Sequence, residues 1–158
     1  MTVQEFVDEY KNSPDKQSEL KKHITRDYIP FAEKQVIANT MISKTINTTE
    51  HEMKYIDWNL YDINFVLSIV LLYTDLQINS ENPLNDYDLL EQISFSENVK
   101  QCIYEDYKRF RQVYEMSAKT FRQSEQSNYE MICKFINNIM TSVSSLMSIT
   151  QGADDSLE

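Results

Sequence analysis

Glycine and proline are almost absent from this chain. Its 158 residues include one glycine and three prolines, whereas β-sandwiches and β-barrels need turn residues about every 8–12 positions. This scarcity argues against an all-β fold and predicts long helices with few connections. It also excludes a phosphate-binding glycine loop, because the single glycine, Gly152, lies near the C-terminus.

The chain also lacks a hydrophobic run long enough to cross a membrane. Its most apolar stretch covers residues 65–77 and reads FVLSIVLLYTDLQ, with an uninterrupted part that ends at Tyr73. A spanning helix needs about 20 predominantly apolar residues, and no Lys or Arg flanks this run to set an orientation. A helix that is apolar on most of its circumference is typical of a protein core. We therefore predict a central core helix from about Asn59 to about Asp75, and no membrane contact.

Three shorter helices are predicted before this core helix. Thr2 and Glu5 form a capping box for a helix over 3–11. Ser13, followed by Pro14, predicts the start of a second helix that extends to about residue 24. Pro30 opens a third helix whose apolar side chains are expected to face inward: Phe31, Ile37 and Met41, with Ile42 and Ile46 as further candidates.

The remaining segments predict one loop region and more helix. Residues 47–57 are polar and without a clear period, which predicts a loop, with a short extended piece at 53–56 as an option. A loop at 79–83 and a short helix around 87–92 follow the core helix. Ser96 is predicted to cap a long C-terminal helix. Since a straight helix over 97–150 would be about 80 Å long, we expect a break near 124–128 that makes a hairpin; a continuous docking or oligomerisation arm is the alternative.

Together these elements predict one domain of the all-α class. A chain of this length most naturally forms a single domain, which we place at 1–151. We expect a multi-helix bundle around the central apolar helix, with the long C-terminal helix or helical hairpin as its last part. Residues 152–158 are expected to be a disordered acidic tail.

Basic residues are missing from the middle of the chain. The formal net charge is −10, and residues 59–98 contain seven acidic residues and no Lys or Arg, a net of −7. Such a segment repels nucleic acid and speeds encounter with basic surfaces, so we expect a protein partner of basic character and no direct nucleic-acid binding. The alternative is a solvated face that keeps the protein soluble. The candidate partner-binding residues are Asp62, Asp75, Glu81, Asp86, Asp88, Glu91 and Glu97.

No catalytic or metal-binding constellation is recognisable in the sequence. His51 begins a stretch like a zinc-protease motif, but Tyr55 stands where the second histidine is needed. His23, with lysines beside it, is interpreted as a surface histidine. Cys102 and Cys133 lie in helical patterns without a second cysteine nearby, so they are not expected to be zinc ligands. We expect both to be buried small apolar residues, with a disulfide in an oxidising compartment as the alternative. We expect no metal, no cofactor and no enzymatic activity.

Four segments carry a resemblance to a known group of proteins. They read MTVQEFV at 1–7, YIPFAEK at 28–34, FVLSI at 65–69 with YTD at 73–75, and YDLL at 87–90. These segments resemble small helical proteins of phages and prophages from low-GC Gram-positive bacteria, over the chain up to about residue 110. Residues 55–64 depart from that pattern because no basic residue precedes the apolar run. The resemblance implies a phage protein in the host cytoplasm or the virion, and it brings no active site.

Two functions are compatible with these features. The first is a non-enzymatic phage protein that acts by protein–protein contact, as a virion structural or assembly component, with a homo-oligomer as one option. The alternative is an acidic inhibitor that mimics nucleic acid and blocks a basic host defence protein. Mimicry predicts rows of exposed acids, whereas assembly predicts an exposed apolar or aromatic patch. Joint exposure of several aromatic side chains would favour an interface hot spot; the candidates are Tyr55, Trp58, Tyr61, Tyr73 and Tyr87.

Overall fold

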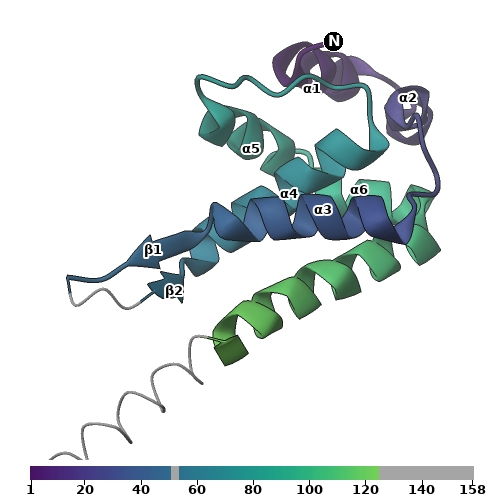
Figure 1. Ribbon diagram of the computed structural model, residues 1–158. Coiled ribbons are helices and arrows are strands. Elements are labelled where there is room, and N and C mark those ends of the chain that lie inside the picture. Colours follow the sequence, from purple (N-terminus) through teal and green to yellow (C-terminus); the bar gives the residue numbers. More distant parts are fainter. Residues whose placement is uncertain (51–53, 125–158) are drawn as a thin grey trace, which may run out of the picture. The chain divides into compact units, whose positions relative to one another are not determined.

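The computed structural model describes residues 1–50 and 54–124, and this part is predominantly α-helical with one small sheet. The predicted all-α class is therefore confirmed. Residues 1–120 form one compact unit. A last helix covers residues 104–124 of the described part. The elements before it are α1 (Val3–Asn12), α2 (Lys16–His23), α3 (Phe31–Ser43), β1 (Ile46–Thr48), β2 (Lys54–Ile56), α4 (Trp58–Tyr73), α5 (Pro83–Glu91) and α6 (Phe95–Cys102) (Figure 1).

Helix α4 is the predicted core helix. Every residue from Phe65 to Val70 is buried, and so are Leu72 and Tyr73, which leaves only Leu71 half-exposed along this stretch. The helix begins where the Asp57 carboxylate accepts the backbone N–H groups of the first turn, at 3.0 and 3.3 Å. Because apolar side chains cover most of its circumference from Phe65 onward, α4 needs neighbours on several sides.

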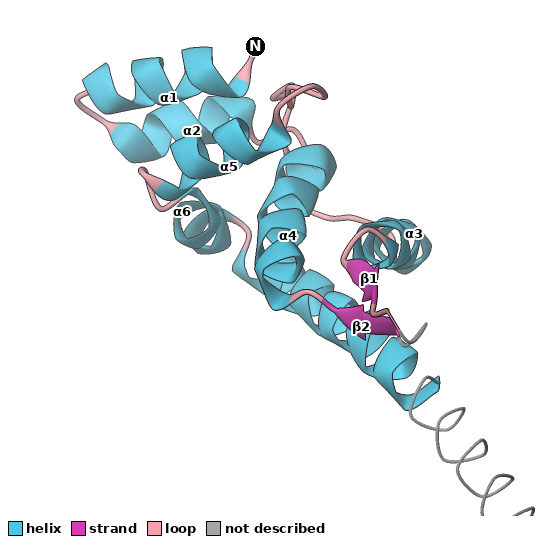
Figure 2. Cartoon of the chain, turned by 90° about the vertical axis from the view of Figure 1, so that its left-hand side faces the viewer, coloured by secondary structure: helices cyan, strands magenta, loops and turns pink. Residues whose placement is uncertain are grey.

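Those neighbours come from both halves of the unit. Figure 2 shows α4 between α3 on one side and α1, α2, α5 and α6 on the other. The helix over 104–124 adds aromatic rings to the same core. Phe65 of α4 stacks on Phe110, with ring centroids 5.7 Å apart, and meets Tyr107 and Tyr114 edge-on. The central position predicted for this helix is therefore confirmed.

The first two helices differ in how well their starts were predicted. The capping box at Thr2 and Glu5 is present: the Thr2 hydroxyl accepts the Glu5 N–H, and the Glu5 carboxylate accepts the Thr2 N–H. The predicted cap at Ser13 is wrong, because Asp15 fills this role with its carboxylate 3.0 Å from the Ser18 amide nitrogen. The Ser13 hydroxyl instead donates to the carbonyl of Asp15.

Helix α3 buries part of the predicted face: Met41 and Ile42 are buried as expected, but Phe31 is not. Phe31 is 62% exposed, whereas the buried residues of α3 are Lys34, Ala38, Met41 and Ile42. This spacing of four, three and one places them on a single stripe, which the ion pair of Lys34 with Asp106 directs inward. Ile37 lies at the edge of the stripe and is half-buried.

A β-hairpin stands where a loop was the main prediction. Strand β1 pairs with β2 antiparallel, with Ile46 opposite Ile56 and Thr48 opposite Lys54. The optional extended piece at 53–56 is confirmed for its described residues 54–56. Ile46 therefore lies in a strand, so its placement in the third helix was wrong. The hairpin begins directly after α3 and leads into α4 (Figure 1).

The chain after α4 is more broken than the sequence suggests. Helix α5 begins at Pro83, four residues earlier than predicted, with the Asn82 side chain accepting an amide of the first turn. Ser96 lies inside α6 and does not cap it. The predicted uninterrupted helix from 97 is wrong because Ile103 leaves helical geometry, with φ −131° and ψ 44°. The break expected near 124–128 and the tail at 152–158 fall outside the described residues, apart from Ser124.

The turn at Ile103 divides one apolar stripe between two sets of helices. Val99 precedes the turn, and both it and Ile103 are buried. Tyr107 and Phe110 follow the turn and are buried as well. Helix α6 contacts α2 and α5, while the rings of the following helix pack on Phe65 of α4. A straight helix could not face both groups, so tertiary packing overrides the helical pattern here.

None of the helices in the described ranges has the length and the hydropathy that crossing a lipid bilayer requires.

Candidate partner-binding surface

The seven acidic residues of the middle segment differ in exposure and in their partners. Asp86 is buried, and its carboxylate accepts the N–H of Asn79 at 2.6 Å. Asp75 pairs with the His23 imidazole at 3.0 Å and Glu97 with Lys100 at 2.8 Å. Asp75 and Glu97 remain exposed in these pairs, whereas Asp86 is withdrawn from solvent. That the seven acids bind one partner stays a prediction.

Three of the other acids converge on one tyrosine. Asp62 of α4 and Asp88 and Glu91 of α5 are exposed, while Tyr87 between them is half-buried. Burial raises the pKa of the Tyr87 hydroxyl, and Glu91, Asp62 and Asp88 raise it further. Within residues 1–50 and 54–124, none of these three carboxylates forms an ion pair. They therefore leave an uncompensated negative charge on the surface. The seventh acid, Glu81, is exposed in the loop before α5.

An aromatic pair adjoins this negative charge. Trp58, the single tryptophan of the chain, is 52% exposed, and its ring centroid lies 5.2 Å from that of Tyr61. Tyr61 is half-buried and also packs on Tyr114. Burial raises the pKa of Tyr61 to about 12, and the charges of Glu115 and Asp62 contribute in the same direction. Asp62 therefore links the aromatic pair to the acids around Tyr87.

The basic residue whose charge acts on Tyr61 is already paired with an acid. Arg111 lies close enough to Tyr61 to oppose the rise of its pKa. Its guanidinium pairs with Glu115 at 3.3 Å and lies over the Phe65 ring, 5.4 Å from the centroid. The acids beside Tyr61 and Tyr87 therefore keep their charge available to solvent.

We call this region the acidic–aromatic surface. It joins the first two turns of α4 to α5, and packing between these helices holds it in place. Exposed carboxylates attract Lys and Arg side chains, and Trp and Tyr rings bind cations on their faces. Of the other expected hot-spot aromatics, Tyr55 in β2 is 48% exposed, whereas Tyr73 is fully buried. The surface consists of Trp58, Tyr61, Asp62, Tyr87, Asp88 and Glu91.

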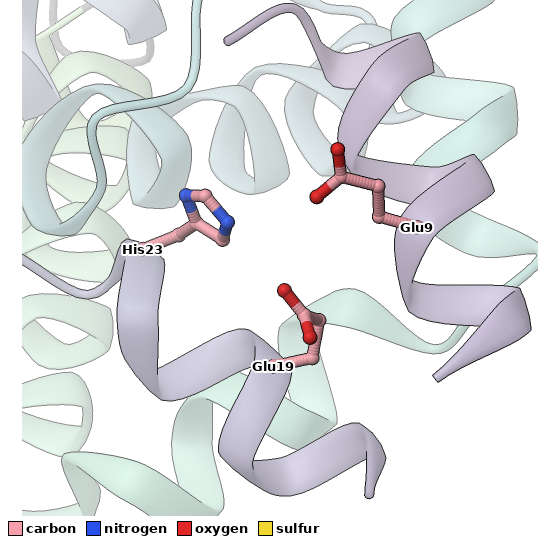
Figure 3. A group of neighbouring side chains, drawn as sticks. All are labelled: Glu9, Glu19 and His23. Atoms are coloured by element: carbon pink, nitrogen blue, oxygen red, sulfur yellow. The ribbon is translucent and has the colours of Figure 1, made fainter. Parts of the chain in front are cut away.

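A second group of polar side chains lies in the first two helices. Glu9 of α1 and Glu19 and His23 of α2 bring their ligand atoms within 4.8 Å of one another (Figure 3). His23 was interpreted as a surface histidine, and this was wrong: it is 9% exposed and packs edge-on against Phe6. The four-residue spacing of Glu19 and His23 was a detectable signal, since it places both on one face of a helix.

The cysteines give no support for a thiol site. Cys102 is half-buried and unbonded, less buried than expected. Cys133 lies outside the described residues.

Comparison of the chain with protein-family models, with curated proteins and with solved structures gave no match.

Proposed function

We propose that this protein acts by protein–protein contact, without catalysis, and that it binds a basic partner through its acidic–aromatic surface. The observation that carries the proposal is a set of three exposed carboxylates, Asp62, Asp88 and Glu91, that form no ion pair within the described residues and lie on the packed helices α4 and α5, with the exposed Trp58 one turn before Asp62. If these carboxylates served only to keep the protein soluble, they would not need an exposed aromatic pair beside them. Their combination is typical of a recognition surface.

The two parts of the surface have different physical roles. Unscreened carboxylates speed the encounter with a basic protein and select against acidic ones. Binding energy comes mainly from a few buried anchors, among which Trp, Tyr and Arg are the most frequent. Trp58 and Tyr61 are such anchors, and an arginine of the partner placed over the Trp58 ring would satisfy both roles.

The proposed setting is a phage particle or its assembly in the host cytoplasm. The four sequence segments that resemble phage proteins support this setting. The aromatic surface favours an assembly role over nucleic-acid mimicry, since mimicry needs rows of exposed acids. Of the seven acids of the middle segment, Asp86 is buried and Asp75 and Glu97 are paired. The largest group of exposed acids without such a partner is therefore the one around Tyr87.

A binding titration with a basic probe tests the proposal. A fluorescently labelled arginine-rich peptide is titrated with the protein at low and at high salt. We expect saturable binding that weakens steeply with salt, and the triple variant D62N/D88N/E91Q should weaken it by more than about tenfold. The matched control is D8N/D27N/E105Q, which removes three exposed acids elsewhere and changes the net charge equally.

The control decides between a surface and a general charge effect. Equal weakening by the two triple variants, or no salt-dependent binding at all, would contradict the proposal. Trp58→Ala should weaken binding without changing the net charge, whereas Leu71→Ala, which removes a side chain of similar exposure from the same helix, should leave it unchanged.

A further inference from the structure

Two helices bring three metal-ligating side chains together. Glu9 extends from the second half of α1, while Glu19 and His23 share one face of α2. Figure 3 shows both carboxylates and one ring nitrogen of His23 directed toward the space between the helices. The ligand atoms of the three lie within 4.8 Å of one another.

The imidazole of His23 is held in a ligating orientation by groups outside this cluster. Its Nδ1 lies 3.0 Å from the Asp75 carboxylate, and the Asp75 N–H donates to the His23 carbonyl at 3.2 Å. Phe6 packs against the ring, with centroids 5.3 Å apart. A histidine that donates one ring N–H to a carboxylate presents the lone pair of its other nitrogen, the arrangement common around protein-bound metals.

The other ring nitrogen of this buried histidine has no partner. Within the part of the chain that the structure describes, Nε2 of His23 accepts and donates no hydrogen bond, although the residue is only 9% exposed. With Nδ1 on Asp75, the nitrogen that faces Glu9 and Glu19 in Figure 3 is Nε2. This nitrogen is therefore open to solvent and free to bind a ligand, and it is directed toward the two carboxylates.

We propose that Glu9, Glu19 and His23 bind one divalent transition-metal ion of the Zn²⁺ class. One imidazole nitrogen with two carboxylates suits Zn²⁺, whereas Ca²⁺ and Mg²⁺ take oxygen ligands. Tetrahedral ligands about 2.0–2.1 Å from Zn²⁺ lie about 3.4 Å apart. Rotation of the exposed Glu9 side chain closes the remaining distance, and a water molecule completes the coordination.

Access and charge are also suited to a cation. A cleft of about 460 Å³ is lined by Glu9, Glu19 and Lys22, together with Asp8 and residues of the α1–α2 turn, so both carboxylates border an open cleft. Lys22 pairs with Glu19 at 2.8 Å, and the charge of Glu9 helps to raise the pKa of Lys22. The Lys22 ammonium group therefore binds the carboxylate that the metal ion would use, and the two cations compete for Glu19.

Binding is measured by calorimetric titration of the full chain with Zn²⁺ alone, in a C102S/C133S/H51Q background that removes the other soft ligands of the sequence. We expect one Zn²⁺ per chain, no saturable binding of Ca²⁺ or Mg²⁺, and a higher unfolding temperature with Zn²⁺. Glu9→Gln should weaken Zn²⁺ binding by more than about tenfold, while its exposed position preserves the fold. The control is Asp8→Asn, an equal charge change at the neighbouring position.

Two further variants separate this site from unspecific attraction of cations. Asp75→Asn should weaken Zn²⁺ binding about 10- to 100-fold, as loss of the carboxylate behind a ligating histidine does elsewhere. Lys22→Met should tighten binding because the competing ammonium group is gone. Absence of saturable Zn²⁺ binding, or equal affinities of Glu9→Gln and Asp8→Asn, would overturn the proposal. The NMR signals of the His23 ring must also shift on Zn²⁺ addition; unchanged signals would overturn it as well.

Discussion

The ammonium group of Lys34 lies 2.5 Å from the carboxylate of Asp106, 72 residues further along the chain, and both side chains are buried. The second carboxylate oxygen of Asp106 accepts the hydroxyl of Tyr73 at 2.8 Å and the N–H of Ile29 at 3.1 Å. One carboxylate thus joins α3, the end of α4, the segment before α3 and the last described helix.

Removing one partner of this ion pair should be strongly destabilising. Lys34→Met leaves the Asp106 carboxylate buried without its cation, and losing half of a buried pair typically costs about 3–5 kcal/mol. We expect the free energy of unfolding in urea to fall by that amount. Lys108→Met, at an exposed position of the same helix as Asp106, is the control and should change it by less than about 0.5 kcal/mol. Similar losses for both variants would contradict the role of the pair.

The central position of α4 gives a second prediction. Ile69 is fully buried, whereas Leu71 on the same helix is 50% exposed. Ile69→Ala leaves a cavity in the core and should lower the free energy of unfolding by about 2–5 kcal/mol. Leu71→Ala should lower it by less than about 0.5 kcal/mol. Denaturant unfolding of the two variants measures this difference, and equal losses would contradict the central position of α4.

Buried tyrosines predict a loss of stability at alkaline pH. Burial raises the pKa of Tyr61 from 10.0 to about 12, and it raises the pKa values of Tyr73 and Tyr114 as well. The folded state therefore holds these protons more tightly than the unfolded chain does. For Tyr61, this contribution is complete below pH 10 and is lost as the pH rises through about 12.

Two signals should follow this loss. Phenolate absorbance and far-ultraviolet circular dichroism are expected to change together between about pH 10 and pH 12. Tyr61→Phe should make the free energy of unfolding less dependent on pH in that range, since the phenylalanine has no proton to lose. If the pH dependence is the same in the variant and the parent protein, Tyr61 does not contribute.

Local signals account for what the sequence predicted correctly. The capping box at Thr2 and Glu5 depends on residues three apart, and the burial of α4 depends on a continuous apolar run. Both are properties of one segment, which a pattern contains in full. The prediction of the all-α class followed from composition in the same way.

The missed features depend on contacts between distant segments. The ion pair of Lys34 with Asp106 and the hydrogen bond of His23 with Asp75 join residues 72 and 52 positions apart. No local pattern reports such pairs, so Phe31 was expected inside and His23 outside. The turn at Ile103 likewise comes from packing on two partners, because no glycine or proline marks it.

The candidate surface was predicted in part. The charge pattern of the sequence identified the segment 59–98, which has acidic residues and no Lys or Arg. That segment contains Asp62, Asp88 and Glu91. The sequence could not show that Asp86 is buried and accepts the Asn79 N–H. Nor could it show that acids of two helices, α4 and α5, together raise the pKa of Tyr87. Which acids share a face is set by the packing of α4 on α5.

A map of NMR shifts on binding tests the proposed contact surface most directly. The backbone amide and Trp58 indole signals are recorded while the unlabelled arginine-rich peptide is added at low salt. The largest shifts are expected at the Trp58 indole and at Asp62, Tyr87, Asp88 and Glu91, and they should fade at high salt. Largest shifts at acids elsewhere, with an unchanged Trp58 indole signal, would contradict the proposed function.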